Sequence, residues 1–157
     1  MNCGTTYRTA VLRAIFWGGL LCGVMDITAA ILVYGLFGAK ALRILQGIAA
    51  GLIGLDSFNG GISTAILGLG CHFFIAFSAA TVFVLASRFV PFLIQHSIIA
   101  GILYGTTVYF FMNRVVVPLS NARKYPFSLK MMLIGVAIHI VCVGLPISIA
   151  TRRSSTL

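Results

Sequence analysis

Four long apolar runs constrain the fold of this chain more than any other feature. They are residues 14–37, 62–87, 92–117 and 131–150. A helix needs about 20 apolar residues to cross the hydrocarbon core of a bilayer. In lipid such segments must be helical, because no water is present to hydrogen-bond the backbone. The sequence therefore predicts an all-α polytopic membrane protein, with four transmembrane helices in one integral membrane domain over residues 1–157.

The overall composition agrees with lipid as the solvent. Of the 157 residues, 60% are hydrophobic and only 8% are charged, whereas a soluble domain carries about 25% charged residues. In a soluble chain the net charge of +9 would suggest nucleic acid as a partner. Here the basic residues lie almost entirely at the ends of the apolar runs, where they contact anionic headgroups. We therefore expect the lipid bilayer as a partner, and no nucleic acid.

A fifth apolar stretch, residues 44–55, lies between the first two runs and contains Gly47, Gly51 and Gly54. As a helix it is too short to cross a core of about 30 Å. We expect a re-entrant or interfacial helix there. The first run is too long for the apolar region of a signal peptide, and no small-residue cleavage site follows it. It is therefore predicted to remain as the first helix.

The basic residues leave the orientation in the membrane almost undetermined. With four crossings, one side holds five cations, which are Arg8, Arg13, Arg88, Arg152 and Arg153. The other side holds six, which are Lys40, Arg43, Arg114, Arg123, Lys124 and Lys130. The positive-inside rule needs a bias between the two sides. We favour cytoplasmic termini, and antiparallel dimers stay open.

Two pairs of glycines are predicted to form helix contacts. Gly19 and Gly23, and likewise Gly101 and Gly105, have the small-xxx-small spacing that lets helix backbones approach in lipid. Asp26 shares the face of the first glycine pair, and His72 shares a face with alanines and Gly68. Both polar side chains are therefore expected to point into the bundle.

Asp26 and His72, together with His139, form the candidate site. An acid at the centre of a bilayer costs at least ~2.5–3.5 kcal/mol, so it needs a partner or a purpose. At a helical rise of about 1.5 Å per residue, the three side chains lie roughly 16, 15 and 12 Å from the same membrane face. The sequence thus predicts three titratable groups near the membrane centre.

Three interpretations of this cluster stay open. In the first, Asp26 accepts a hydrogen bond from His72 or His139, or stays protonated, and the polar core fixes the helix register. In the second, the groups relay a proton or cation. In the third, His72 and His139 ligate a haem iron, or the histidines hold a soft metal with Cys22, Cys71 and Cys142. No ligand spacing supports the third interpretation, so we expect no metal and no cofactor.

Asn113 and Arg114 stand near the end of the third run. Arg114 lies close enough to the membrane surface to extend its side chain to the headgroups. In the alternative, Asn113 or Arg114 turns inward and gates the polar cluster, or binds an anionic headgroup or substrate.

Soluble enzyme chemistry has no support in the sequence. The chain has no HExxH, no GxSxG and no glycine-rich loop after a strand. Its only two carboxylates, Asp26 and Asp56, are separated by loop and membrane, which argues against paired acid–base hydrolysis. We expect that the protein is not an enzyme.

Six short segments carry a resemblance to known proteins. They are GVMDITAA (23–30), IAAG (48–51), FNGG (58–61), GLGCHFFIA (68–76), GILYG (101–105) and MNRVVVPLS (112–120). They resemble a family of small uncharacterised bacterial inner-membrane proteins, with a more distant similarity to the YagU type. The resemblance implies a multi-pass protein of the bacterial inner (cytoplasmic) membrane. Its pattern includes Asp26 and His72 but not His139, and it brings no biochemical activity.

The leading functional expectation is a structural or accessory membrane protein with a buried Asp26–His72 core. It is expected to form a homo-oligomer or to belong to a larger membrane complex. The alternatives are a proton-coupled transporter or channel subunit that uses the same residues, and a haem-binding membrane subunit.

Overall fold

The structure is a computed structural model that describes residues 3–124 and 126–155. All regular elements in this part of the chain are helical. In chain order they are α1 (Cys3–Leu36), α2 (Ala41–Ile53), the 3-10 helix η1 (Gly54–Asn59), α3 (Gly61–Ala86), α4 (Phe92–Gln95), α5 (Ser97–Phe111), the π-helix η2 (Met112–Val116), α6 (Val117–Leu119), α7 (Leu129–Ile138), the π-helix η3 (His139–Gly144) and α8 (Leu145–Ser155). The predicted all-α class is confirmed for these residues.

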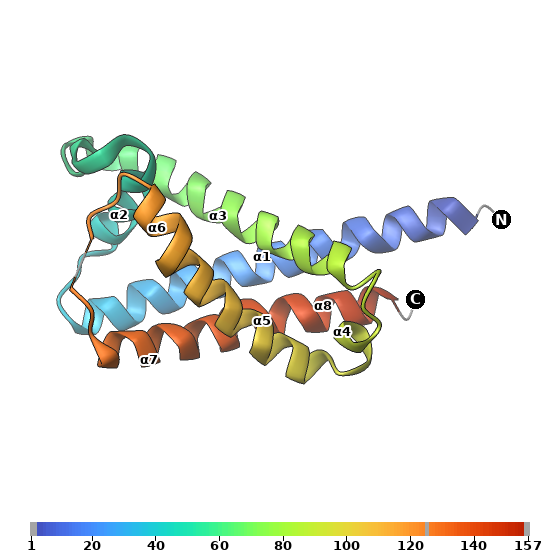
Figure 1. Ribbon diagram of the computed structural model, residues 1–157. Helices are drawn as coiled ribbons and strands as arrows, with labels where there is room; N and C mark the ends of the chain where they lie inside the picture. The colour runs from blue at the N-terminus through green and yellow to red at the C-terminus, as the bar shows by residue number, and fades with distance from the viewer. Residues whose placement is uncertain (1–2, 125, 156–157) are drawn as a thin grey trace.

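The helices form an elongated bundle with two distinct ends (Figure 1). We call the end where α1 begins and α8 finishes the terminal end. The loop end is the opposite one, which holds α2, η1 and the start of α7. The helices α1 and α3 cross each other and separate toward the loop end, where α2 packs against α3. The connected helices α7, η3 and α8 run beside α1 and α5.

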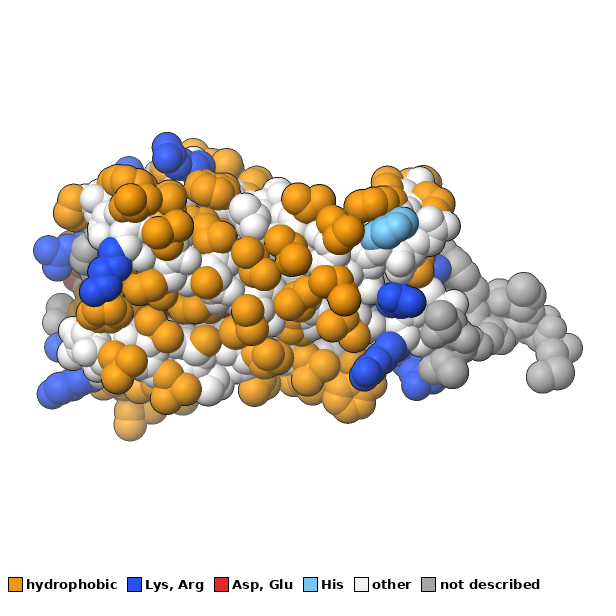
Figure 2. Space-filling model, turned by 90° about the horizontal axis from the view of Figure 1, so that it is seen from below, with side chains coloured by type: hydrophobic (Ala, Val, Ile, Leu, Met, Phe, Trp, Pro, Cys, Tyr) orange, Lys and Arg blue, Asp and Glu red, His pale blue; other side chains and the backbone are white. Residues whose placement is uncertain are grey.

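Five helical stretches of the described chain are long and apolar enough to cross a membrane. They are Arg8–Leu36, Ala41–Asn59, Gly61–Ala86, Ser97–Leu119 and Leu129–Ser155. On the face shown in Figure 2, apolar side chains cover the middle of the molecule, and lysines and arginines lie toward its two ends. This distribution is that of a membrane protein, whose apolar belt faces lipid and whose cations face headgroups.

The helix boundaries differ from the predicted runs at two places. The short stretch 44–55 lies inside a longer helical region, because η1 continues the chain after Gly54, which has a φ of 72°. The third run is divided, because His96 (φ −114°, ψ 52°) interrupts the helix between α4 and α5. Apolar composition alone does not reveal either change of backbone direction.

Each π-helix precedes a proline. The N–H of Val117 donates to the Met112 carbonyl, and the N–H of Leu145 donates to the Ile140 carbonyl, both across five residues. Pro118 and Pro146 follow immediately. A proline cannot donate to the carbonyl four residues earlier, and its ring clashes with that carbonyl. The wider π turn relieves this conflict within a continuous helix.

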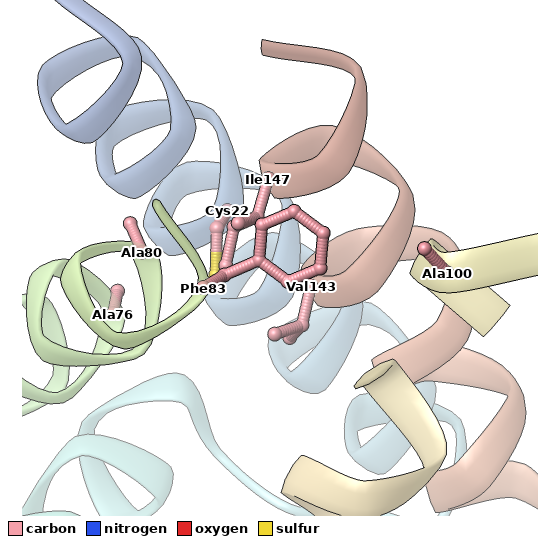
Figure 3. Close-up of a cluster of buried hydrophobic side chains, with 7 residues drawn as sticks. All are labelled: Cys22, Ala76, Ala80, Phe83, Ala100, Val143 and Ile147. Carbon is pink, nitrogen blue, oxygen red and sulfur yellow. The ribbon is translucent and has the colours of Figure 1, made fainter. Parts of the chain in front are cut away.

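The hydrophobic core lies toward the terminal end of the bundle. Figure 3 shows its core, which consists of Cys22, Ala76, Ala80, Phe83, Ala100, Val143 and Ile147. These side chains come from α1, α3, α5, η3 and α8. None of the seven is more than 8% exposed. Small residues dominate the set, as expected where helices associate by close contact in lipid.

Glycines bring the helix backbones into contact around this core. A Cβ atom at Gly144 would collide with the Gly101 carbonyl, and one at Gly105 would collide with the His139 carbonyl. On α1, the rings of Phe77 and Phe73 lie where side chains of Gly19 and Gly23 would stand. Both predicted glycine pairs therefore lie at helix contacts, one against backbone and the other against aromatic rings.

Candidate functional site

The three titratable residues singled out in the sequence lie at similar depths in the bundle. Asp26 is on α1, His72 on α3 and His139 at the start of η3. At a rise of about 1.5 Å per residue, each is roughly 15 Å from the loop-end terminus of its helix. All three side chains are half-buried. Depth alone would therefore permit a cluster, and hydrogen-bond geometry decides whether one forms.

His72 joins two helices through a backbone carbonyl. Its Nε2 lies 2.9 Å from the carbonyl oxygen of Gly23 on α1, so Nε2 carries the proton that is donated. The imidazole also packs edge-on against Phe73, with 5.6 Å between the ring centroids. Because Gly23 has no side chain and Phe73 fills the space beside it, α3 lies close enough to α1 for this bond.

His139 makes a different kind of bond. Its Nδ1 lies 2.9 Å from the carbonyl oxygen of Gly135, one turn earlier in the same helical column. Its ring meets Tyr109 of α5 edge-on, with 5.3 Å between the centroids. The Tyr109 ring fills the space next to Gly135. His139 is therefore held by its own helix and by an aromatic neighbour, and not by Asp26.

Asp26 makes no hydrogen bond and no salt bridge with any residue in the described ranges. The predicted hydrogen bond from His72 or His139 to Asp26, and with it the buried Asp–His core, is wrong. The physical reason is competition. Both imidazoles donate to backbone carbonyls that glycines leave accessible, and the carbonyl used by His72 is only three residues from Asp26.

The titratable groups that interact electrostatically with Asp26 include a tyrosine that the sequence argument missed. Its carboxyl group lies within electrostatic range of Cys22 and Tyr34 on α1 and of Cys142 on η3. Tyr34 in turn lies within range of Tyr109. The spacing of eight residues between Asp26 and Tyr34, about two helical turns, could have revealed this neighbour. The contribution of Tyr109 depends on how α5 crosses α1, which the sequence does not show.

The two candidate gating residues lie on η2 and are both exposed. The Asn113 side-chain amide donates to the Tyr109 carbonyl at 3.0 Å, back along its own helix. Arg114 lies within electrostatic range of Tyr109. Neither residue bonds to Asp26, His72 or His139. The exposed position of Arg114 is the geometry that contact with a headgroup requires.

The third interpretation of the polar cluster was a metal or haem site. No group of three or more histidine, cysteine or acidic side chains in the described ranges is arranged to hold a metal ion. Cys22 and Cys142 are buried as free thiols, and Cys71 is half-buried. A haem iron bound by both histidines would take the ring nitrogens that do not donate to the glycine carbonyls, which are Nδ1 of His72 and Nε2 of His139.

A polar network at the loop end was also missed. The Gln46 amide of α2 donates to the Gly61 carbonyl at 3.0 Å, and Arg43 donates to the Phe58 carbonyl at 2.7 Å. The Thr64 hydroxyl donates to the Ser57 carbonyl at 2.6 Å. Gln46 is 1% exposed. It is the only polar side chain in the apolar stretch 44–55. A single polar residue in an apolar stretch was the sequence feature that could have indicated this network.

The same end is closed by the segment after α6. The backbone N–H of Asn121 donates to the Gly51 carbonyl at 3.0 Å, and its side-chain amide donates to the Leu52 carbonyl at 3.2 Å. These bonds satisfy carbonyls in the last turn of α2 that have no partner within the helix. The short helix α2 is therefore fixed on two sides, by α3 with η1 and by the chain after α6.

Comparison with known proteins identifies no matching family model and no significantly similar curated protein or solved structure. The resemblance to small bacterial inner-membrane proteins therefore stays a prediction.

Proposed function

We propose that the chain is a small integral membrane protein of structural or accessory type with four crossings. The crossings are α1, α3, the α5–α6 column and the α7–α8 column. In this arrangement α2 and η1 lie at the loop end as a re-entrant or interfacial unit. The support is that α1 ends and α3 begins at the loop end, so α2 and η1 connect two helix ends on the same side (Figure 1). By itself α2 is about 20 Å long at the usual helical rise, whereas α2 and η1 together are long and apolar enough to cross a membrane.

The observation that carries the accessory role is the use of polar groups inside the apolar belt. His72 binds the Gly23 carbonyl, and the Tyr104 hydroxyl donates to the Ala79 carbonyl at 2.7 Å. Both bonds join one helix to another. Hydroxyls such as Thr81 and Thr107 donate instead to their own helices. Such bonds contribute about 0.6 kcal/mol each in lipid and fix helix register, which suits a rigid scaffold within an oligomer or larger complex.

The topology is tested by single cysteines in a cysteine-free variant. Asn59→Cys at the loop end and Ser155→Cys at the terminal end should react with a membrane-impermeant thiol reagent from opposite faces of intact cells. A cysteine at exposed Lys40 should react from the same face as Asn59→Cys. Reaction of Lys40→Cys from the opposite face would mean that α2 and η1 cross the membrane, and the four-crossing arrangement would then be abandoned.

The accessory role is tested by identifying the proteins that bind the chain in its native membrane. Crosslinking followed by mild detergent extraction should recover the chain in a defined oligomer or complex. A chain that is always recovered as a monomer would overturn this role.

A second candidate function is a proton-coupled transporter or channel subunit centred on Asp26. The specific observation in its favour is that Asp26 lacks a hydrogen-bond partner in the described ranges, whereas both histidines have one. An intramembrane carboxylate without a structural task is expected to serve a proton or ion. The hydrogen bonds of His72 and His139 do not involve Asp26, so its carboxyl group is available to bind a proton or an ion.

Flux measurements in proteoliposomes test this candidate. Asp26→Asn should abolish proton flux driven by a pH gradient while the protein stays folded. Asp56→Asn is the matched control, because Asp56 is the only other carboxylate of the chain and is exposed at the loop end. Flux that is absent from the wild type, or that is equal in all three proteins, would contradict the transport role.

A further inference from the structure

We infer that α2 is a re-entrant helix whose apolar side is covered by the acyl chains of the loop-end leaflet. This side consists of Leu45, Ile48 and Leu52, and we call it the apolar stripe. The inference rests on the four-crossing arrangement proposed above and deepens it, because that arrangement leaves the depth of α2 open. It is supported by the direction of the polar side of α2, by the level of α2 on α3 and by the hydrogen bonds at the end of α2.

The polar side of α2 is turned toward the protein. Arg43, Gln46 and Ala50 lie on one side of the helix, at spacings of three and four residues. Gln46 and Ala50 are each 1% exposed, and Gln46 donates to the Gly61 carbonyl at the start of α3. Arg43 donates to the Phe58 carbonyl of η1. A helix on a water-facing surface turns its polar residues outward, so the arrangement of α2 is the reverse.

The apolar stripe is only partly covered by the protein. It lies on the side of the helix opposite Arg43. Leu45 and Ile48 are half-buried, and Leu52 is 62% exposed. Contact with water is unfavourable for such a stripe, whereas lipid tails are as apolar as leucine. The uncovered side of α2 therefore suits hydrocarbon.

The contact between α2 and α3 lies below the start of α3. A Cβ atom at Gly68 would collide with the Leu45 carbonyl of α2. Gly68 is seven residues from Gly61, the first residue of α3, which corresponds to about 10 Å along the helix. Asn59, just before α3, is exposed and polar, so this end of α3 belongs at the headgroups. Half of a hydrocarbon core is about 15 Å thick, so the contact lies within the loop-end leaflet.

The carbonyls at the end of α2 are hydrogen-bonded as lipid requires. Asn121 donates its backbone N–H to the Gly51 carbonyl and its side-chain amide to the Leu52 carbonyl. The N–H of Gly54 donates to the Ala50 carbonyl. Water can solvate the last carbonyls of a helix, whereas in lipid they need partners within the protein. These bonds let the chain turn at Gly54 without exposing those carbonyls to acyl chains.

Both ends of the segment carry exposed polar residues. Lys40 precedes α2, and Asp56 and Asn59 belong to η1. Such side chains belong in the headgroups or in water, so the chain enters the leaflet at Lys40 and returns through η1. Lipid as the partner agrees with Ile66, which is 65% exposed on α3 close to Gly68. Acyl chains therefore reach this level of the bundle.

Fluorescence quenching tests the depth of the apolar stripe. Ile48→Cys and Leu52→Cys are each made in the cysteine-free variant, labelled with an environment-sensitive fluorophore and reconstituted into phosphatidylcholine vesicles. Lipids with a nitroxide high on the acyl chain should quench both positions as strongly as the lipid-facing reference Ile66→Cys. Iodide in the water on both sides should quench Lys40→Cys and should not quench either position of the stripe.

Two results would overturn the inference. Iodide quenching of Ile48→Cys and Leu52→Cys equal to that of Lys40→Cys would place the stripe in water. Protection from both quenchers would mean that another protein chain covers the stripe. Either result leaves the four crossings standing if Lys40→Cys and Asn59→Cys react with the impermeant reagent from the same face. Reaction of these two from opposite faces would overturn both the re-entrant helix and the four crossings.

Discussion

The terminal half and the loop-end half of the bundle hold their helices together in different ways. In the terminal half, glycines bring backbones into contact, and the seven core residues are almost completely buried. In the loop-end half, Gly68 likewise brings α3 against the Leu45 carbonyl of α2, and polar side chains such as Gln46 and Arg43 also donate to backbone carbonyls. Asp26 and both intramembrane histidines remain only half-buried there. The loop-end half thus adds side-chain hydrogen bonds to the close backbone contacts that both halves have.

Substitution at the contact between Gly144 and Gly101 should have the largest effect. It should destabilise the helix packing of the terminal half. A methyl group at Gly144 collides with the Gly101 carbonyl, and backbone cannot turn aside as a side chain can. We expect Gly144→Ala to lower the free energy of unfolding by about 1–3 kcal/mol, measured by thermal unfolding in detergent. Gly70→Ala is the control, because nothing lies within 4 Å of its new Cβ. Equal stability of the two variants would refute the close approach of α5 and η3.

Loss of Gln46 should have the next largest effect, confined to the loop end. Gln46→Ala removes the donor to the Gly61 carbonyl and leaves buried polar groups without partners. Such a loss costs about 1–3 kcal/mol. We expect hydrogen exchange in α2 to accelerate while exchange in the core helices is unchanged. The exposed Gln95→Ala is the control. Faster exchange throughout the bundle would show that the two halves do not unfold separately.

The two histidines should differ by a smaller amount. His72→Phe removes a bond between α3 and α1, whereas His139→Phe removes a bond within one helical column. An interhelical hydrogen bond in lipid contributes about 0.6 kcal/mol, so His72→Phe should lower the thermal midpoint more than His139→Phe. The reverse order would mean that the contact between His139 and Tyr109 contributes more than the interhelical bond.

Asp26→Asn should have the smallest effect on stability. No hydrogen bond or salt bridge in the described ranges is lost. We expect the free energy of unfolding to change by less than about 0.5 kcal/mol. Asp56→Asn at the exposed loop end provides the comparison in the same assay. A large loss of stability on Asp26→Asn alone would make Asp26 a structural residue and would argue against the transport role.

The extent of the long helices was predictable because bilayer thickness limits the length of an apolar helix. The run 62–87 corresponds to α3, and 14–37 ends within one residue of α1. The interruption at His96 and the two π-helices were not predicted, although Pro118 and Pro146 mark both π-helices in the sequence. A proline indicates that the backbone must adjust. Its neighbours in space decide whether the helix kinks, breaks or widens.

The candidate site was predicted less well than the helices. Helical spacing predicted a common depth for Asp26, His72 and His139, because depth follows from the rise per residue. It gave the wrong hydrogen-bond partners, because the choice between a carboxylate and a glycine carbonyl depends on distances between helices. The bonds of Gln46 escaped notice for the same reason.

By itself the sequence determined the solvent of this protein, the helical state of its long runs and the approximate depth of each polar group. These properties follow from hydropathy, backbone hydrogen bonding in lipid and the helical rise. Only the tertiary structure decided which carbonyl each histidine binds and that Asp26 binds none in the described ranges. It also decided which glycines bring helix backbones into contact. Crossing angles and close contacts between helices set these features, and a linear pattern of residues does not specify them.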